Sequence, residues 1–482
     1  MPHLRTLDHK TPSLARPLAG GGVCALAAST SKHGPCGLQR RVLCILEEVA
    51  SGADHSCSRG AAAVQGRGLR AVGALLTMLA ALVATACAGL NENAATFYNR
   101  GVVYQRQGDP DRAIQDYDQA LRLNPNLVPA FINRGIAYRT KGDYDRAIED
   151  FDQAVRLQPN SAFALTSRAI AYRAKGAYER AIQDYDQALR LNPNDADVLT
   201  SRGLAYWASA AYDRAIQDFD EAHRLKPNSA PALYNRGIAY LAKHDYDRAI
   251  EDFDQALRLT PNDTDALHNR GAAYAGKGEY KRALEDFDQA LRLNPNDTNA
   301  LNGRGIAFAK KGDYDRAIED FDQALRLNPN SGPVIYSRGL TRFYQGQFGA
   351  AVSDLAKGVQ PAPSNLYGLL WLYLARARAG QDARDELVRA ASPLNLTQWP
   401  GPVVSFYAGT TNEQAVFAAT ADTDSERQRE QECEAYFFVG QSHLLQGRKA
   451  EAARMFQAAV ATGATSSGGY DGAKAELVRL GH

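Results

Sequence analysis

The chain has 482 residues, of which 45% are hydrophobic and 23% are charged, and this leaves ample material for a continuous core. Its net charge is +1, but the first 90 residues hold 9 Lys and Arg against 4 Asp and Glu, so the remainder carries about +1 − 5 = −4. This mildly acidic body argues against general binding of nucleic acids.

Residues 1–63 show neither hydrophobic periodicity nor a capped helix. Arg67 and Arg70 then precede an uncharged stretch from Ala71 to Leu90, which is the order of a signal peptide. We therefore expect residues 1–63 to be disordered or a mis-annotated start, with translation beginning near Val64. Residues 64–87 are predicted to be the signal peptide.

The segment Val83-Ala84-Thr85-Ala86-Cys87 resembles the lipobox of bacterial lipoproteins, although Ala84 stands where leucine is usual. The resemblance implies cleavage before Cys87 and acylation of that cysteine, and two or more acyl chains would give stable anchoring. Without cleavage, residues 71–90 would be long enough to anchor the chain in the inner membrane. In both cases the preceding arginines place the rest of the chain outside the cytoplasm.

The dipeptide Arg-Gly returns seven times on a period of 34 residues, and repetition at this length is typical of a stacked solenoid. Eight units fill residues 94–365. They start at Ala94, Val128, Ala162, Ala196, Ala230, Thr264, Thr298 and Gly332.

Each unit carries two apolar stripes of period 3.6 divided by a break, and this predicts a helical hairpin. In the second unit, the small residues Gly135 and Ala147 are expected where the two helices approach each other. Gly142 can end the first helix in a left-handed conformation, Asp143 can cap the second, and Pro159 cannot continue it.

The spacing of small and aromatic residues in each unit closely resembles the tetratricopeptide repeat. The second unit shows it with Phe131, Gly135, Tyr138, Gly142, Tyr144, Ala147, Phe151, Ala154 and Pro159. The resemblance implies an all-α fold, a right-handed superhelical solenoid of helical hairpins, with the first helices lining a concave groove.

Two charged positions do not vary among the eight units. The seventh is always arginine, from Arg100 to Arg338, and the twenty-third is always aspartate, from Asp116 to Asp354. We predict a ladder of Arg–Asp pairs that ties helix to helix or repeat to repeat. The alternative is a solvated charged rim, in which each pair would contribute only about 0–1 kcal/mol.

Positions two, five, nine and twelve share a face of the first helix, and there the units differ. Aromatic side chains with a polar tip are typical anchors for partner surfaces. Few fixed charges on this face favour an extended peptide or a partner's helix over a phosphate backbone. The predicted partner-binding residues are Tyr98, Gln105, Arg139, Arg173, Trp207, Tyr234, His268, Tyr336 and Phe343.

Residues 366–482 are predicted to form degenerate helical repeats. A ninth repeat-like unit is expected over residues 433–466, where Gly440, Gly447, Ala452 and Phe456 keep the repeat spacing. The segment Tyr470 to Leu480 can serve as a capping helix, which a repeat array needs at its end.

The same region is similar to the end of the outer-membrane lipoprotein adaptors of the new-lipoprotein-I type. The shared features are the segment from Trp399 to Gly409, ending in Phe-Tyr-Ala-Gly, and the segment from Glu434 to Gly447. The resemblance implies a periplasm-facing dimeric scaffold that binds cell-wall hydrolases and presents them to a protease. This chain departs from that family by having more, and more uniform, repeats.

Motifs for catalysis, cofactors and metals are missing, and the nine histidines are scattered, so we expect no enzyme, no cofactor and no metal. The leading function is a lipid-anchored scaffold for envelope proteins. A cytosolic co-chaperone-like adaptor is the alternative, but position nine is apolar at Val102, Ile136, Ile170 and Leu204, where a carboxylate clamp would need cationic donors. An enzyme with its site in residues 366–482 is the third class.

Overall fold

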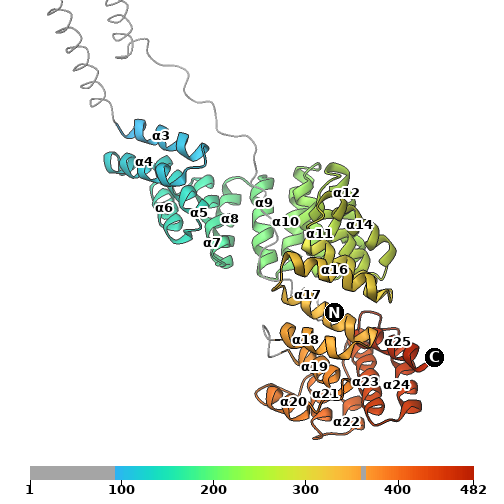
Figure 1. Cartoon of the computed structure of the whole chain (residues 1–482). Coiled ribbons are helices and arrows are strands. Elements are labelled where there is room, and N and C mark those ends of the chain that lie inside the picture. Colours follow the sequence, from blue (N-terminus) through green and yellow to red (C-terminus); the bar gives the residue numbers. More distant parts are fainter. Residues whose placement is uncertain (1–92, 360–364) are drawn as a thin grey trace, which may run out of the picture. The chain divides into compact units, whose positions relative to one another are not determined.

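A computed structural model describes residues 93–359 and 365–482, and every regular element in these ranges is an α-helix (Figure 1). The predicted all-α fold of consecutive hairpins is confirmed. The predictions on residues 1–63, on residues 64–87 with Cys87, and on the anchor at residues 71–90 lie outside the described residues. Among the described helices, none combines the length and the apolar character needed to cross a bilayer.

Residues 93–127 form a compact unit of one hairpin, made by helices α3 (Ala94–Arg106) and α4 (Pro110–Leu123). Residues 128–482 form the other unit, which begins with seven hairpins. Their first helices are α5 (Val128–Thr140), α7 (Ala162–Ala174), α9 (Ala196–Ala208), α11 (Ala230–Ala242), α13 (Thr264–Gly276), α15 (Thr298–Lys310) and α17 (Gly332–Gln345). Their second helices are α6 (Tyr144–Leu157), α8 (Tyr178–Leu191), α10 (Tyr212–Leu225), α12 (Tyr246–Leu259), α14 (Tyr280–Leu293), α16 (Tyr314–Leu327) and α18 (Phe348–Val359).

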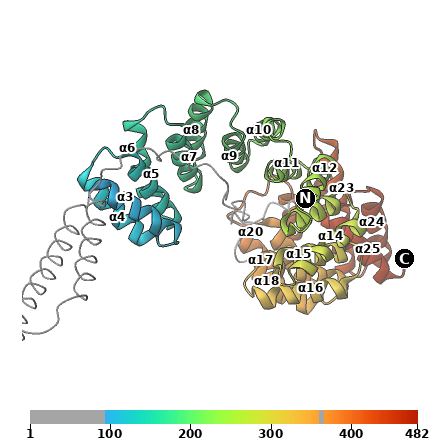
Figure 2. The same ribbon diagram turned by 90° about the horizontal axis from the view of Figure 1, so that it is seen from above.

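The hairpins from α5 to α18 stack in sequence order, since each second helix packs against its own first helix and against the first helix of the next hairpin (Figure 2). A close contact between a glycine and an aromatic ring sets the helix spacing within a hairpin. A Cβ atom on Gly135 would come within 2.8 Å of the Phe151 ring, which is 0% exposed. Gly237 and Phe253 repeat this contact at the same 2.8 Å. A larger residue at either glycine would force the helices apart, at about 1–3 kcal/mol.

The turn inside each hairpin follows the predicted chemistry. Gly142 adopts a left-handed conformation with φ of 80°, and the Asp143 carboxylate accepts a hydrogen bond from the backbone N–H of Arg146 at 3.1 Å. Two hairpins place a residue other than glycine at the left-handed position, namely Ala210 and His244, each with φ of 61°. A Cβ is unfavourable in this conformation because it crowds the following carbonyl oxygen.

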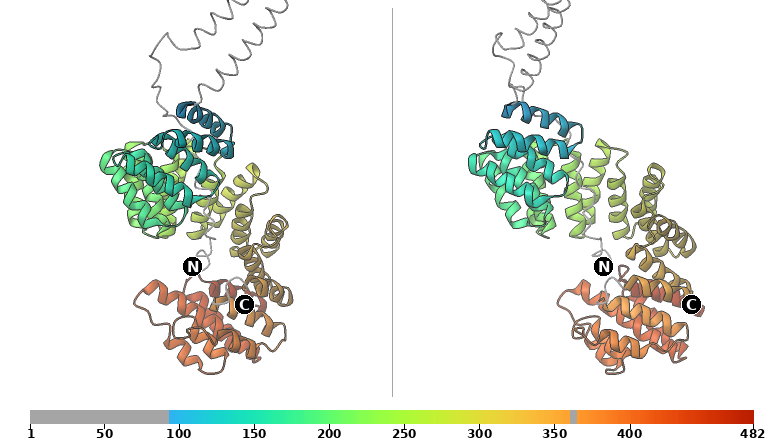
Figure 3. Two further views of the ribbon diagram at one scale, coloured as in Figure 1. Left: turned by 90° about the vertical axis from the view of Figure 1, so that its left-hand side faces the viewer. Right: turned by 60° about the vertical axis from the view of Figure 1, so that its left-hand side comes forward.

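The C-terminal region continues the unit beside α17 and α18 (Figure 3). Its helices are α19 (Leu366–Arg378), α20 (Arg384–Ala391), α21 (Gly401–Tyr407), α22 (Glu413–Ala418), α23 (Ser425–Leu445), α24 (Lys449–Ala461) and α25 (Gly468–Leu480). The pair α23–α24 shows the glycine–ring contact of the repeats, since a Cβ on Gly440 would lie 2.6 Å from the Phe456 ring. Between α19 and α23, the helices α20 to α22 are short and interrupt the hairpin pattern.

The strained turn gives a stability prediction. Replacing Ala210 with glycine removes the Cβ penalty at a left-handed, exposed position, and we expect this to stabilise the array by about 1 kcal/mol. The urea midpoint followed by circular dichroism measures the change. The matched control is Gly142→Ala, which should lower the midpoint. An Ala210→Gly variant that is less stable than the parent would contradict the left-handed assignment.

Candidate functional site

The charged positions that do not vary form ion pairs inside each of the eight hairpins from α3 to α18. In each one, the arginine Nε and Nη2 atoms donate to the two carboxylate oxygens of the aspartate on the second helix, over distances of 2.5–2.8 Å. The pairs are Arg100–Asp116, Arg134–Asp150, Arg168–Asp184, Arg202–Asp218, Arg236–Asp252, Arg270–Asp286, Arg304–Asp320 and Arg338–Asp354. The predicted ladder of Arg–Asp pairs is therefore confirmed.

The remaining guanidinium nitrogen, Nη1, reaches the preceding hairpin. A link from repeat to repeat was one of the two predicted forms of the ladder, but its aspartate was not singled out from the sequence. The Nη1 atom donates to an aspartate at position twenty-five of the preceding hairpin, over 2.6–2.7 Å. These pairs are Arg168–Asp152, Arg202–Asp186, Arg236–Asp220, Arg270–Asp254, Arg304–Asp288 and Arg338–Asp322. The ladder thus joins helix to helix and also repeat to repeat.

The carboxylates at position twenty-three are buried, so they need their arginines to compensate their charge. The Asp252 side chain is 3% exposed and that of Arg236 is 15% exposed. Burial raises the pKa of Asp252, and the hydrogen bonds from Arg236 act in the opposite direction. Those same bonds raise the pKa of Arg236, so the guanidinium stays charged at every relevant pH. Loss of Arg236 would leave the Asp252 carboxylate buried without compensation, and loss of Asp252 would leave Arg236 with Asp220 alone.

This dependence gives the second prediction. Asp252→Ala leaves the Arg236 guanidinium without two charge-assisted hydrogen bonds, and we expect a loss of about 3 kcal/mol in the free energy of unfolding. The urea midpoint is the measurement, because long repeat arrays need not unfold in two states. The control is Glu221→Ala, which removes an exposed pair with Arg224 and should leave the midpoint nearly unchanged. Equal effects of the two variants would reject a structural role for the ladder.

Two of the predicted partner-binding residues lie on α3, and both contact the side chain of Tyr117. The Tyr98 ring lies 6.0 Å from that of Tyr117, and the Tyr117 hydroxyl donates to Oε1 of Gln105 at 2.6 Å. Both Tyr98 and Gln105 are half-buried. The partner of Gln105 is thus a tyrosine of the same hairpin.

Arg139 and Arg173 occupy position twelve in consecutive hairpins, on α5 and α7. Neither forms an ion pair with any residue of the described ranges, in contrast to the ladder arginines. Trp207 follows at the same position on α9, where its ring packs against a core that includes Phe219 and Phe253, while its Nε1 atom is buried without a partner. The structure therefore brings the two arginines and the tryptophan to equivalent places on neighbouring hairpins.

The predicted residues of later hairpins are more enclosed. The Tyr234 hydroxyl accepts a hydrogen bond from Nδ2 of Asn269 at 3.0 Å, and its ring lies 5.9 Å from that of Phe253. The His268 ring lies 5.6 Å from that of Phe287, and burial lowers the pKa of His268. Burial also raises the pKa of Tyr336. These residues are packed between helices, which limits what they offer to a partner.

The prediction that Phe343 lines the groove is wrong. Its side chain is 0% exposed and packs edge-on against Phe348 and Trp371, with ring centroids 5.3 Å away in both cases. The physical reason is that α19 follows the last hairpin and places Trp371 over Phe343. Position twelve of this hairpin is therefore part of the C-terminal core.

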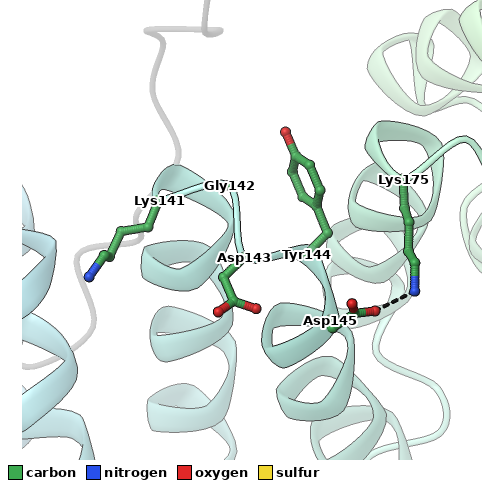
Figure 4. A pocket seen from close by; sticks show the side chains of 6 residues that line it. All are labelled: Lys141, Gly142, Asp143, Tyr144, Asp145 and Lys175. Atoms are coloured by element: carbon green, nitrogen blue, oxygen red, sulfur yellow. Dashed lines mark hydrogen bonds and ion pairs between the residues drawn. The ribbon is translucent and has the colours of Figure 1, made fainter.

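A polar recess lies at the turn between α5 and α6, and its residues were not among the predicted partner-binding residues (Figure 4). It is lined by Lys141, Gly142, Asp143, Tyr144, Asp145 and Lys175. An ion pair joins Lys175 to Asp145 of the preceding hairpin. Because the pairs Lys243–Asp213 and Lys277–Asp247 repeat this link further along, the recess belongs to the stacking of hairpins and is not distinctive as a ligand site.

Glu434 lies in the C-terminal core, and in the sequence it stands out only as part of a motif. Its Oε2 atom accepts hydrogen bonds from the Tyr367 hydroxyl at 2.8 Å and from Nε1 of Trp399 at 2.7 Å. Burial raises the pKa of Glu434 to about 7, while the bonds from Trp399 and Tyr367 act in the opposite direction. A single carboxyl group thus links α19, α23 and the segment before α21.

No group of three His, Cys, Asp or Glu side chains within residues 93–359 and 365–482 is placed to hold a metal ion.

The third prediction concerns pH. Because the folded-state pKa of Glu434 is raised from 4.5 to about 7, its stabilising contribution is complete below pH 4.5 and is lost as the pH rises through 7. We expect the unfolding free energy to fall by up to about 3 kcal/mol between pH 5 and pH 8. Urea midpoints from tryptophan fluorescence measure this fall. Glu434→Gln should flatten it, whereas the exposed control Glu426→Gln should not. An unchanged pH dependence in Glu434→Gln would assign the effect to another group.

Matches to family models agree with this architecture. Family models described as tetratricopeptide repeats match residues 94–127, 128–161 and 169–209, and three overlapping matches span 200–332. MamA is 30% identical over 33% of this chain and 94% of its own, with a TM-score of 0.32. A repeat protein from Parabacteroides merdae is 24% identical over 52% of this chain and 98% of its own, with a TM-score of 0.44. YrrB, described as having an unusual peptide-binding site, is 24% identical over 38% of this chain and 95% of its own, with a TM-score of 0.33. No curated protein sequence matches the chain.

Proposed function

Because this chain belongs to the tetratricopeptide-repeat family, we propose that it is a non-catalytic scaffold that binds other proteins or peptides on the faces of its first helices. The observation that carries the proposal is the contrast between two sets of positions. The ladder residues repeat without change, while positions two, five and twelve of the first helices vary from one hairpin to the next. A rigid frame with a variable face is suited to selective binding.

One exposed aromatic side chain supports this use of the face. Phe163, at position two of α7, is 61% exposed, which makes it the most exposed aromatic residue among the large exposed hydrophobic residues of the described ranges. Aromatic anchors contribute much of the energy of protein interfaces. Scattered exposed leucines, such as Leu191 at 43%, lie at the ends of second helices instead.

The finer part of the proposal is that the scaffold is a periplasm-facing lipoprotein, held at the outer membrane through acylated Cys87, and that its partners are cell-wall hydrolases or proteases. Support comes from the resemblance of residues 83–87 to a lipobox and of the segments around Trp399 and Glu434 to the lipoprotein adaptors. A homodimer is part of the same proposal, since dimers are usual in that family. Inner-membrane anchoring by residues 71–90 is the alternative.

Intact mass and membrane fractionation of the natively expressed protein test the anchor. We expect a mature chain that begins at Cys87, carries acyl groups and sediments with the outer membrane. Cys87→Ser should abolish acylation and release the protein or leave it uncleaved in the inner membrane. A soluble chain that begins at Met1 would reject the lipoprotein and move the search for partners to the cytoplasm.

Retention of purified cell-wall hydrolases on the immobilised chain tests the scaffold. Phe163→Ala should weaken retention by about tenfold, because an exposed aromatic anchor is lost with little effect on the fold. Leu191→Ala is the matched control, since it shortens an exposed apolar side chain away from the first-helix face. Equal retention by both variants and the parent would place the binding surface elsewhere.

A further inference from the structure

The arginines at position twelve of the second and third hairpins are half-buried, and they lack the acidic partners that the ladder arginines have. The ladder arginines each bind one or two aspartates, whereas Arg139 and Arg173 form no ion pair within the described ranges. The Nε atom of Arg173 is buried without a hydrogen-bond partner. Arginine has donors only, and no carboxylate of residues 93–359 and 365–482 forms an ion pair with either side chain.

A buried hydroxyl group beside them has the same need. Tyr185, on α8, is 0% exposed, and its hydroxyl has no hydrogen-bond partner among the described residues. Burial raises the pKa of Tyr185, and Arg173 and Arg139 act in the opposite direction. The nearby Ser201 hydroxyl already donates to the carbonyl oxygen of Asp197.

The first hairpin shows how this position is satisfied elsewhere. Tyr117 occupies the same position as Tyr185, and its hydroxyl donates to the side-chain Oε1 of Gln105, which stands at position twelve of that hairpin. In the third hairpin the residue at position twelve is Arg173, which cannot accept a hydrogen bond. The arginine therefore removes the acceptor that the tyrosine hydroxyl has in the first hairpin.

Burial lowers the pKa of Arg139, and the charge of Arg173 lowers it further, while Tyr185 acts in the opposite direction. Two guanidinium groups that repel each other in a partly buried setting are stabilised by an anion placed between them.

We propose that Arg139, Arg173 and the Tyr185 hydroxyl form a binding site for a carboxylate, supplied by an Asp or Glu side chain in a segment of a partner protein. The inference rests on the proposed scaffold function and names the chemistry of its partner. Surrounding residues favour a single carboxylate in an apolar segment, because Ile136 and Ile170 lie at position nine and Phe163 is exposed on α7. A polyanion is a poorer match to a body whose net charge is about −4 after the first 90 residues.

The chain itself uses this mode of binding at another hairpin. Lys310, near the end of the first helix α15, donates to Oδ2 of Asp471 at 2.5 Å and to the carbonyl oxygen of Thr465 at 3.3 Å. Asp471 belongs to α25, about 160 residues away along the sequence. An acidic side chain from a distant segment is thus held by a cation at the end of a first helix, as we infer for Arg139 and Arg173.

Selection of random displayed dodecapeptides on the immobilised full chain tests the site. We expect the selected peptides to be enriched in Asp or Glu flanked by apolar residues. A selected peptide should bind about tenfold more tightly, by fluorescence anisotropy, than its twin with Asn or Gln in place of the acid. No acidic enrichment, or equal affinity of the twins, would overturn the proposal. Preference for a phosphopeptide or for a single-stranded oligonucleotide in the same assay would overturn it as well.

Two variants locate the binding in this cluster. Arg139→Gln with Arg173→Gln should weaken the acidic peptide at least about tenfold and remove the difference between the twins. Tyr185→Phe should weaken it by several-fold without loss of stability, because phenylalanine fills this position in other hairpins, as at Phe151 and Phe219. The matched control is Arg156→Gln with Arg190→Gln, which removes the same charge from exposed positions on α6 and α8 and should leave affinity unchanged.

Failure of this site is distinguishable from failure of the scaffold function. If hydrolase retention depends on Phe163 but the double arginine variant binds the acidic peptide as the parent does, the scaffold stands and the carboxylate site is rejected. If no peptide of any composition is selected and no hydrolase is retained, both are rejected.

Discussion

The arginine at position seven joins three helices through one planar group, and the stacking of the hairpins depends on it. In Arg236, Nε and Nη2 bind Asp252 on the second helix of the same hairpin, while Nη1 binds Asp220 on the preceding second helix. Lysine could not replace it, because a single ammonium group lacks the fixed fork that serves two carboxylates in two directions. The ladder therefore fixes the register of neighbouring helices in addition to attracting them to one another. The aspartates that an arginine binds within its own hairpin are buried. Those of the preceding hairpin are more exposed, and the Asp220 side chain is 51% exposed.

Local rules in the sequence were sufficient to predict the hairpins and part of this ladder. The glycine at position eight, the left-handed Gly142 and the cap at Asp143 each have a short-range physical cause, so their roles could be inferred from a single unit. The aspartate that makes the link to the preceding hairpin was missed, although its signal is present. Aspartate stands at position twenty-five wherever position seven of the next hairpin, 16 residues later, is arginine. At the last hairpin these two places hold Ala356 and Leu372. There the polar link gives way to an apolar core that includes both residues.

The C-terminal core could not be predicted in the same way, because its contacts join segments without a common period. Glu434 accepts from Trp399 and from Tyr367, which are 35 and 67 residues away in the sequence. Phe343 has the position of a groove residue and the environment of a core residue, since Trp371 of α19 covers it. Arg479 likewise donates to the carbonyl oxygen of Tyr344 at 2.7 Å and so ties α25 to the end of α17. Periodicity predicts a residue's place within a hairpin; it does not predict what covers an irregular end.

Near-identical hairpins make a single departure from the pattern informative, because the backbone around it is held constant. Tyr117 and Tyr185 occupy one position, and the residue at position twelve alone decides whether the buried hydroxyl is satisfied, as with Gln105, or lacks an acceptor, as with Arg173. A buried donor without an acceptor costs about 1–3 kcal/mol, so it is a poor solution for stability alone. The same third hairpin also exposes Phe163. An unmet polar need and an exposed anchor on one helix are what a binding face requires, and neither follows from the requirements of stacking.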